Sequence, residues 1–185
     1  MDPVNNPYQP GAGRRPPEIA GRGEQTDAFD VLMRRSEAGF GERGRVLYGL
    51  RGVGKTVLLG EFQAMAEHRK WLTVKVEAAA GRSVLPLLAQ SLYRSLRIVS
   101  GTVARERITK MLRVFRSFSV RVDPTGSYAF GFEVEPDTGR ADSGDPAIDL
   151  AELFAELGRT ARDLGVGGLI LVDEMQDVPR EELRA

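Results

Sequence analysis

The sequence lacks several residue types on which common functional sites depend. It contains no cysteine and a single histidine, His68. The absence of cysteine excludes disulfides and thiolate metal sites, and one histidine excludes zinc-finger patterns. The longest strongly apolar run, 167–172, is far shorter than the ~20 residues that a membrane helix requires. The N-terminus has no basic-then-apolar signal pattern. These absences predict a soluble, cytoplasmic protein with no membrane partner.

Opposite charges balance over the whole chain but not along it. The 185 residues carry 26 basic and 26 acidic side chains. Residues 94–121 have a net charge of +7, whereas residues 122–185 have a net charge of −10. The basic block is either a surface for nucleic acid or a protein partner, or a helix face that pairs with an acidic helix downstream. Charge complementarity favours the second interpretation, so DNA is a possible partner but not the favoured one. The acidic helix would present Asp149, Glu152, Glu156 and Asp163.

Hydrophobic periodicity predicts strands that alternate with helices. Residues 1–17 hold five of the ten prolines, which is typical of a disordered leader. Two apolar-polar alternations within 118–134 flank a turn and predict a β-hairpin. The whole order predicts an α/β fold with a parallel sheet flanked by helices. Helices are expected at 24–38, 56–70, 83–99, 102–115 and 145–164, and short apolar strands at 45–48, 71–77 and 168–172.

One glycine-rich segment matches the phosphate-binding pattern G-x-x-x-x-G-K-[ST] completely. The predicted strand 45–48 precedes it and a predicted helix follows it, which is the context that this pattern requires. Its glycines allow the backbone to approach an oxygen closely, and the helix N-terminus adds partial positive charge. Lys55 would reach the β- and γ-phosphates, and the Thr56 hydroxyl would bind Mg²⁺. The phosphate-binding loop consists of Gly49, Leu50, Arg51, Gly52, Val53, Gly54, Lys55 and Thr56.

A second constellation is an apolar strand that ends in two carboxylates, Asp173 and Glu174. Asp173 would serve the Mg²⁺ shell, directly or through water. Glu174 would act as the general base that activates the attacking water. The alternative is a strand that runs into an acidic loop, but a phosphate-binding loop in the same chain favours the catalytic interpretation. No Asn-Lys-x-Asp motif for guanine occurs, which favours ATP.

With these motifs the chain resembles the AAA+ ATPases, most of all bacterial AAA proteins related to origin-recognition and STAND ATPases. The glycine-rich loop corresponds to the Walker A motif of that family. The apolar strand that ends in Asp173 and Glu174 corresponds to the Walker B motif. The segment 17–24 is similar to the one that lies against adenine in that family, and it would make Arg22 a nucleotide-binding residue. The resemblance covers about residue 16 to the end. It implies ATP and Mg²⁺ as cofactors and a P-loop ATPase domain over 18–185.

The chain departs from the family pattern in two respects. Lys55 and Asp173 are 118 residues apart, so about 102–144, with the basic helix and the hairpin, would be an insertion. The family's sheet order is 5-1-4-3-2, and this chain would supply only strands 1–3 of five. The core would then be incomplete, as in the front part of a longer domain. The open sheet edges would favour pairing with a protein partner or self-association.

Three functional hypotheses follow from these residues. The first is ATP binding with Mg²⁺-dependent hydrolysis, in which Lys55 and Glu174 are catalytic. The second is a nucleotide-dependent switch with little turnover that acts on DNA or a protein partner. The third is an inactive fragment.

Overall fold

The computed structural model describes residues 21–99, 109–116, 143 and 145–184. The predicted leader 1–17 and the predicted hairpin 118–134 lie outside these residues, as does most of the proposed insertion 102–144. The described chain divides into two compact units, with the boundary between Arg69 and Lys70. None of the helices within the described ranges is long and apolar enough to cross a membrane.

The first unit contains two helices that pack through their apolar faces. They are α1 (Gly23–Glu37) and α2 (Lys55–His68). Phe29 of α1 stacks on Phe62 of α2, with ring centroids 4.0 Å apart and an interplanar angle of 14°. Met33 and Ala66 are fully buried beside this pair. These side chains recur at helical spacing, so the periodicity predicted both the helices and the faces that they bury.

Arg69, directly after α2, ties this helix to α1 by two ion pairs. Its guanidinium donates to a carboxylate oxygen of Glu37 at 2.8 Å and to one of Asp30 at 2.5 Å. The hydrogen bond to Glu37 raises the pKa of Arg69, burial opposes this increase, and the hydrogen bond to Asp30 adds to it. Arg69 therefore stays charged at every pH at which the protein is folded.

The predicted strand at 45–48 is wrong. Residues 40–50 contain neither helix nor strand, and Val46 and Tyr48 are 70% and 93% exposed. A strand forms only when a neighbouring strand accepts and donates its ladder hydrogen bonds. The sheet order implied by the family resemblance places this segment beside strands other than the two that the structure describes. This short apolar segment therefore has no partner strand among the described residues.

The second unit is built on a parallel two-stranded sheet of β1 (Leu72–Glu77) and β2 (Gly168–Asp173). The register places Val74 opposite Ile170 and Glu77 opposite Asp173. The two carboxylates therefore share the carboxyl edge of the sheet. These are the second and third predicted strands, and they are neighbours as the family's order implies. The α/β class with a parallel sheet flanked by helices is thus confirmed, with two strands in the described residues.

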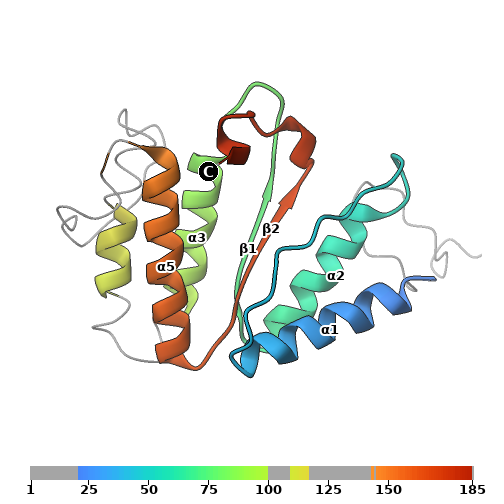
Figure 1. Ribbon diagram of the computed structural model, residues 1–185, viewed down its shortest axis with the longest axis horizontal. Helices are drawn as coiled ribbons and strands as arrows, with labels where there is room; N and C mark the ends of the chain where they lie inside the picture. The colour runs from blue at the N-terminus through green and yellow to red at the C-terminus, as the bar shows by residue number, and fades with distance from the viewer. Residues whose placement is uncertain (1–20, 100–108, 117–142, 144, 185) are drawn as a thin grey trace, which may run out of the picture. The chain divides into compact units, whose positions relative to one another are not determined.

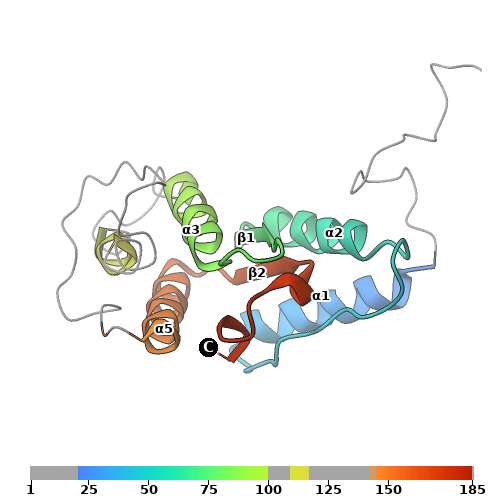
Figure 2. The same ribbon diagram turned by 90° about the horizontal axis from the view of Figure 1, so that it is seen from above.

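Helices α3 (Leu85–Val99) and α5 (Pro146–Leu164) cover one face of this sheet (Figures 1 and 2). The alternation of β1 directs Leu72, Val74 and Val76 toward them. Helical residues 109–116 complete the core with Met111, Val114 and Phe115. Gly165, with φ of 67°, ends α5 where the sequence predicted, because a glycine accepts this left-handed conformation without a steric penalty.

The start of α3 is capped by one nearby side chain and one that is distant in the sequence. The Ser83 hydroxyl accepts a hydrogen bond from the Leu85 N–H at 3.3 Å. A carboxylate oxygen of Glu182 accepts one from the Val84 N–H at 2.9 Å. Glu182 begins the 3₁₀ helix η2 (Glu182–Arg184). The chain after β2 therefore returns to the start of α3, a contact that no local pattern indicates.

An ion pair joins the basic block to the acidic helix. The Lys110 ammonium lies 3.7 Å from a carboxylate oxygen of Glu156 on α5, and Arg159 donates to the other oxygen of Glu156 at 2.8 Å. Glu156 is 3% exposed and Lys110 lies on the surface. Intramolecular charge pairing is thus confirmed for Lys110. Asp149 is also buried, and it accepts hydrogen bonds from the backbone N–H and the hydroxyl of Ser143.

Gly167→Ala is expected to destabilise the second unit. A Cβ built at Gly167 would lie 2.2 Å from two ring atoms of Trp71, which is a severe clash with a buried aromatic ring. Overpacking of this kind costs about 1–3 kcal/mol. Thermal unfolding followed by circular dichroism should therefore show a lower midpoint. Gly168→Ala is the matched control, because a Cβ there meets nothing within 4 Å. Equal midpoints for the two variants would contradict the prediction.

Candidate functional site

The glycine-rich loop has the backbone conformation that its composition predicts. Gly49, Gly52 and Gly54 have φ angles of 154°, 82° and 85°. A residue with a side chain is strained at such positive φ angles, whereas glycine is not, and this explains the glycines at these three positions. Gly54 is in the left-handed region and is the N-cap of α2. The loop therefore turns directly into the helix, so that the N-terminus of α2 is the end of the loop.

Lys55 within the loop and Arg22 outside it both donate to carbonyl oxygens of the loop. Lys55 Nζ donates to the carbonyl of Gly49 at 3.0 Å and to that of Leu50 at 2.9 Å. The Arg22 guanidinium donates to the carbonyl of Val53. Arg22 is the N-cap residue of α1, so the start of that helix is joined to the loop. The structure thus brings Arg22, Lys55 and the loop together within the first unit.

The turn from loop to helix leaves several backbone donors without acceptors. Within the described residues, no protein acceptor is found for the N–H groups of Gly54, Lys55, Thr56 and Val57. Such groups at a helix N-terminus carry partial positive charge and bind anions, phosphate above all. A Cβ at Gly52 or Gly54 would meet nothing within 4 Å, so the space beside these glycines is open. The residues present therefore fit a phosphate group.

The carboxyl end of β2 carries the predicted acidic pair in a tight turn. Asp173 is 6% exposed, and its Oδ1 accepts a hydrogen bond from the Glu174 N–H at 3.0 Å. Glu174 is exposed. Asp173 is in the last position of β2, and η1 (Met175–Asp177) follows immediately. The strand therefore ends with one carboxylate held against the backbone and the next directed to solvent.

Glu174 has an unusual backbone conformation and a partner that the sequence did not predict. Its φ and ψ are 51° and 41°, in the left-handed region, which a non-glycine residue rarely occupies. Gln176 Nε2 donates a hydrogen bond to Glu174 Oε2. Backbone outliers of this kind concentrate at functional sites. Only the proximity of Gln176 in the sequence could have indicated this contact, because no periodicity governs such a turn.

Each of the two motifs offers an oxygen ligand of the kind that Mg²⁺ prefers. This cation prefers oxygen ligands and is usually bound by one or two protein groups together with water and substrate phosphates. The Asp173 carboxylate and the Thr56 hydroxyl are ligands of that type. No group of three or more His, Asp or Glu side chains in the described parts of the chain could hold a metal without further ligands. The residues therefore fit a metal that arrives with a nucleotide rather than a closed metal site.

The two motifs lie in different compact units. Arg22 and Gly49–Thr56 belong to the first unit, and Asp173 and Glu174 belong to the second. Each motif is assembled by contacts within its own unit.

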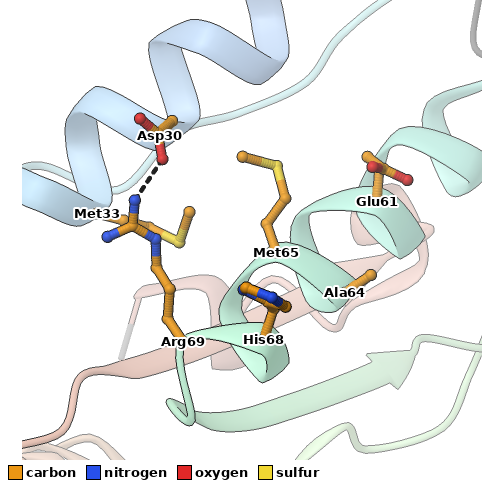
Figure 3. A pocket seen from close by; sticks show the side chains of 7 residues that line it. All are labelled: Asp30, Met33, Glu61, Ala64, Met65, His68 and Arg69. Carbon is orange, nitrogen blue, oxygen red and sulfur yellow. Dashed lines mark hydrogen bonds and ion pairs between the residues drawn. The ribbon is translucent and has the colours of Figure 1, made fainter.

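A pocket in the first unit lies away from the glycine-rich loop. It has a volume of about 360 Å³ and is bordered by α1, α2 and Arg69 (Figure 3). His68 is at the end of α2, whereas Lys55 is at its start. With a rise of about 1.5 Å per residue, the two ends of this helix are about 20 Å apart. The pocket is therefore not part of the phosphate-binding loop. Its lining residues are Asp30, Met33, Glu61, Ala64, Met65, His68 and Arg69.

In a comparison with family models, residues 18–185 match the AAA ATPase domain. This range includes both motifs and nearly the whole chain. No match was found among curated proteins or among solved structures.

Proposed function

The chain belongs to the AAA ATPase domain family, and from this premise we propose that it binds ATP with Mg²⁺ and hydrolyses the bond between the β- and γ-phosphates, which gives ADP and phosphate. Lys55 and the N–H groups at the start of α2 bind the phosphates. Thr56 and Asp173 hold Mg²⁺, and Glu174 activates the attacking water. When bound, Mg²⁺ neutralises charge on the phosphate oxygens and orients them. Arg22 is assigned to the nucleotide as well.

The observation that carries this proposal is the set of unsatisfied donors at the start of α2. Backbone N–H groups of a folded protein are nearly always paired with an acceptor. Here Gly54, Lys55, Thr56 and Val57 have no protein acceptor within the described residues. A triphosphate supplies several acceptor oxygens at once, and Lys55 adds a full positive charge beside them. The geometry of the loop therefore supports a phosphorylated ligand rather than a purely structural turn.

The acidic pair supports hydrolysis because its two carboxylates, Asp173 and Glu174, lie in different surroundings. Asp173 is held by the Glu174 N–H and is largely buried, which suits a carboxylate with a fixed position near a metal. Glu174 is exposed, so water has access to it. A general base must be within hydrogen-bond reach of the water from which it takes the proton. The exposed residue of the pair is thus better suited to act as the base.

A second candidate function is a nucleotide-dependent switch that acts on a protein partner. It is favoured by the exposed apolar segment before the glycine-rich loop. Val46, Tyr48 and Leu50 are 70%, 93% and 82% exposed, and this segment forms no ladder with either described strand. Exposed apolar residues on an unpaired segment are suited to pairing with a strand of another molecule. In this function nucleotide binding would change the partner affinity and turnover would be slow.

Nucleotide binding and phosphate release by the 185-residue chain test the proposal. Isothermal titration with ATP and Mg²⁺ should give saturable binding with a Kd of about 1 μM to 1 mM, the usual range for substrates. GTP should bind more weakly. Phosphate release should exceed that of buffer and require Mg²⁺. Binding without release would identify the switch, and the absence of binding would overturn both functions.

A further inference from the structure

We infer that Gln176 is a positioning residue, whose side-chain amide holds the Glu174 carboxylate in one orientation for its reaction with water. The inference rests on the proposed function, because it takes Glu174 as the general base. Gln176 has no role in that function as stated above. It lies in η1, two residues beyond Glu174.

The contact itself is specific in its chemistry. Gln176 Nε2 lies 2.5 Å from Glu174 Oε2. An ionised carboxylate can only accept hydrogen bonds, so the amide nitrogen of Gln176 must face it. The amide occupies one carboxylate oxygen and leaves Oε1 to accept a proton from water. A donor without charge fixes the carboxylate without forming an ion pair that would compete with its work as a base.

The turn at the end of β2 supplies the geometry for this contact. The left-handed backbone of Glu174 reverses the chain, and the Asp177 N–H donates to the Glu174 carbonyl at 2.8 Å. On the other side, the Glu174 N–H is bound by Asp173 Oδ1 at 3.0 Å. The backbone of Glu174 is therefore held at both its N–H and its carbonyl. Its side chain is long and exposed, and only the Gln176 amide among the described residues restricts its rotation.

Gln176→Ala removes this restriction and should slow the chemical step. Because misplacement of a catalytic group by about 1 Å can cost up to 100-fold in rate, we expect kcat for ATP hydrolysis to fall about tenfold. The KM for ATP should stay within about twofold, since Gln176 does not contact the nucleotide. Gln176→Glu should lower kcat at least as much, because an ionised carboxylate cannot donate. An increased KM with an unchanged kcat would overturn the inference.

Gln63→Ala is the matched control. Gln63 also lies on a helix and its Nε2 donates to a carboxylate, that of Glu67, at 2.8 Å. The same substitution there removes an equivalent surface hydrogen bond and should leave kcat unchanged. A fall in kcat equal to that of Gln176→Ala would show a general loss of stability and would contradict the positioning role.

The contact can also be observed without turnover. In ¹⁵N NMR, the side-chain amide signals of Gln176 should shift in Glu174→Ala but not in Glu181→Ala. Unchanged signals in Glu174→Ala would overturn the inference. If Glu174→Gln loses turnover while Gln176→Ala keeps it, the positioning role of Gln176 is wrong but Glu174 remains the general base. If Glu174→Gln keeps the turnover of the parent chain, or if the parent releases no phosphate, the assignment of Glu174 as base fails and the inference with it.

Discussion

Lys55→Ala is expected to weaken ATP binding by about 100-fold or more. Lys55 is the one lysine within the glycine-rich loop, and its Nζ is 3.0 Å and 2.9 Å from two loop carbonyls. Hydrogen bonds to charged groups are worth about 1.5–3 kcal/mol each, and tenfold in affinity corresponds to about 1.4 kcal/mol. Contacts from Lys55 to the β- and γ-phosphates therefore account for a loss of this size. The substitution also releases the carbonyls of Gly49 and Leu50, which would loosen the loop.

Isothermal titration with ATP and Mg²⁺ measures this effect. Lys110→Ala is a suitable control, because it removes the same charge from an exposed position in the other unit. The Lys110 ammonium in its ion pair with Glu156 is exposed to solvent. Ion pairs of exposed side chains contribute little to stability. Circular dichroism should show the same helix content in both variants. Affinity for ATP in Lys55→Ala within about threefold of the parent would mean that the loop is a structural turn.

Glu174→Gln is expected to lower kcat for ATP hydrolysis by about 100-fold or more and to leave ATP affinity within about twofold. General base catalysis contributes about 10² to 10⁴-fold, and a neutral amide cannot take the proton from water. The size of the side chain is retained. Glutamine keeps an acceptor for the Gln176 amide, and it is no worse suited than glutamate to the left-handed backbone at this position. The loss should therefore lie in the chemical step.

Phosphate release under saturating ATP measures kcat, and titration measures affinity. Glu181→Gln removes the same charge from an exposed position in the same unit and should behave as the parent. A fall in affinity as large as the fall in kcat would assign Glu174 to nucleotide or metal binding instead. Unchanged turnover would show that another group activates the water.

Local chemistry was sufficient to predict most elements and the residues of both motifs. Helix α2 follows the glycine-rich loop as predicted, because a loop with positive φ at Gly52 and Gly54 can turn directly into a helix. Strand β2 was recognisable because it is an apolar run that ends in two carboxylates. These features depend on residues that are close together in the sequence, so their spacing alone carries the information. The roles of Arg22, Lys55, Thr56, Asp173 and Glu174 remain predictions for the experiments above.

The sequence did not predict features that depend on contacts between distant residues or on a turn without periodicity. These are the wrong strand, the undecided interpretation of the basic block and the contact of Gln176. Residues 45–48 have the apolar composition of a short strand but no partner for its hydrogen bonds, so they form no strand and Val46 and Tyr48 stay exposed. The basic block admitted two interpretations until Lys110 was found beside Glu156. The amide of Gln176 and the carboxylate of Glu174 meet because the backbone reverses at a left-handed residue.

The sequence by itself determined that the chain has no thiolate chemistry, and it predicted which residues would bind phosphate and metal and activate water. It did so because cysteine is absent and because the two motifs are local patterns of glycine, lysine and carboxylate. The tertiary structure decided which strands pair, which charges neutralise each other and how the Glu174 carboxylate is held. These depend on the partner that each group meets in the folded chain, and no spacing along the sequence specifies that partner.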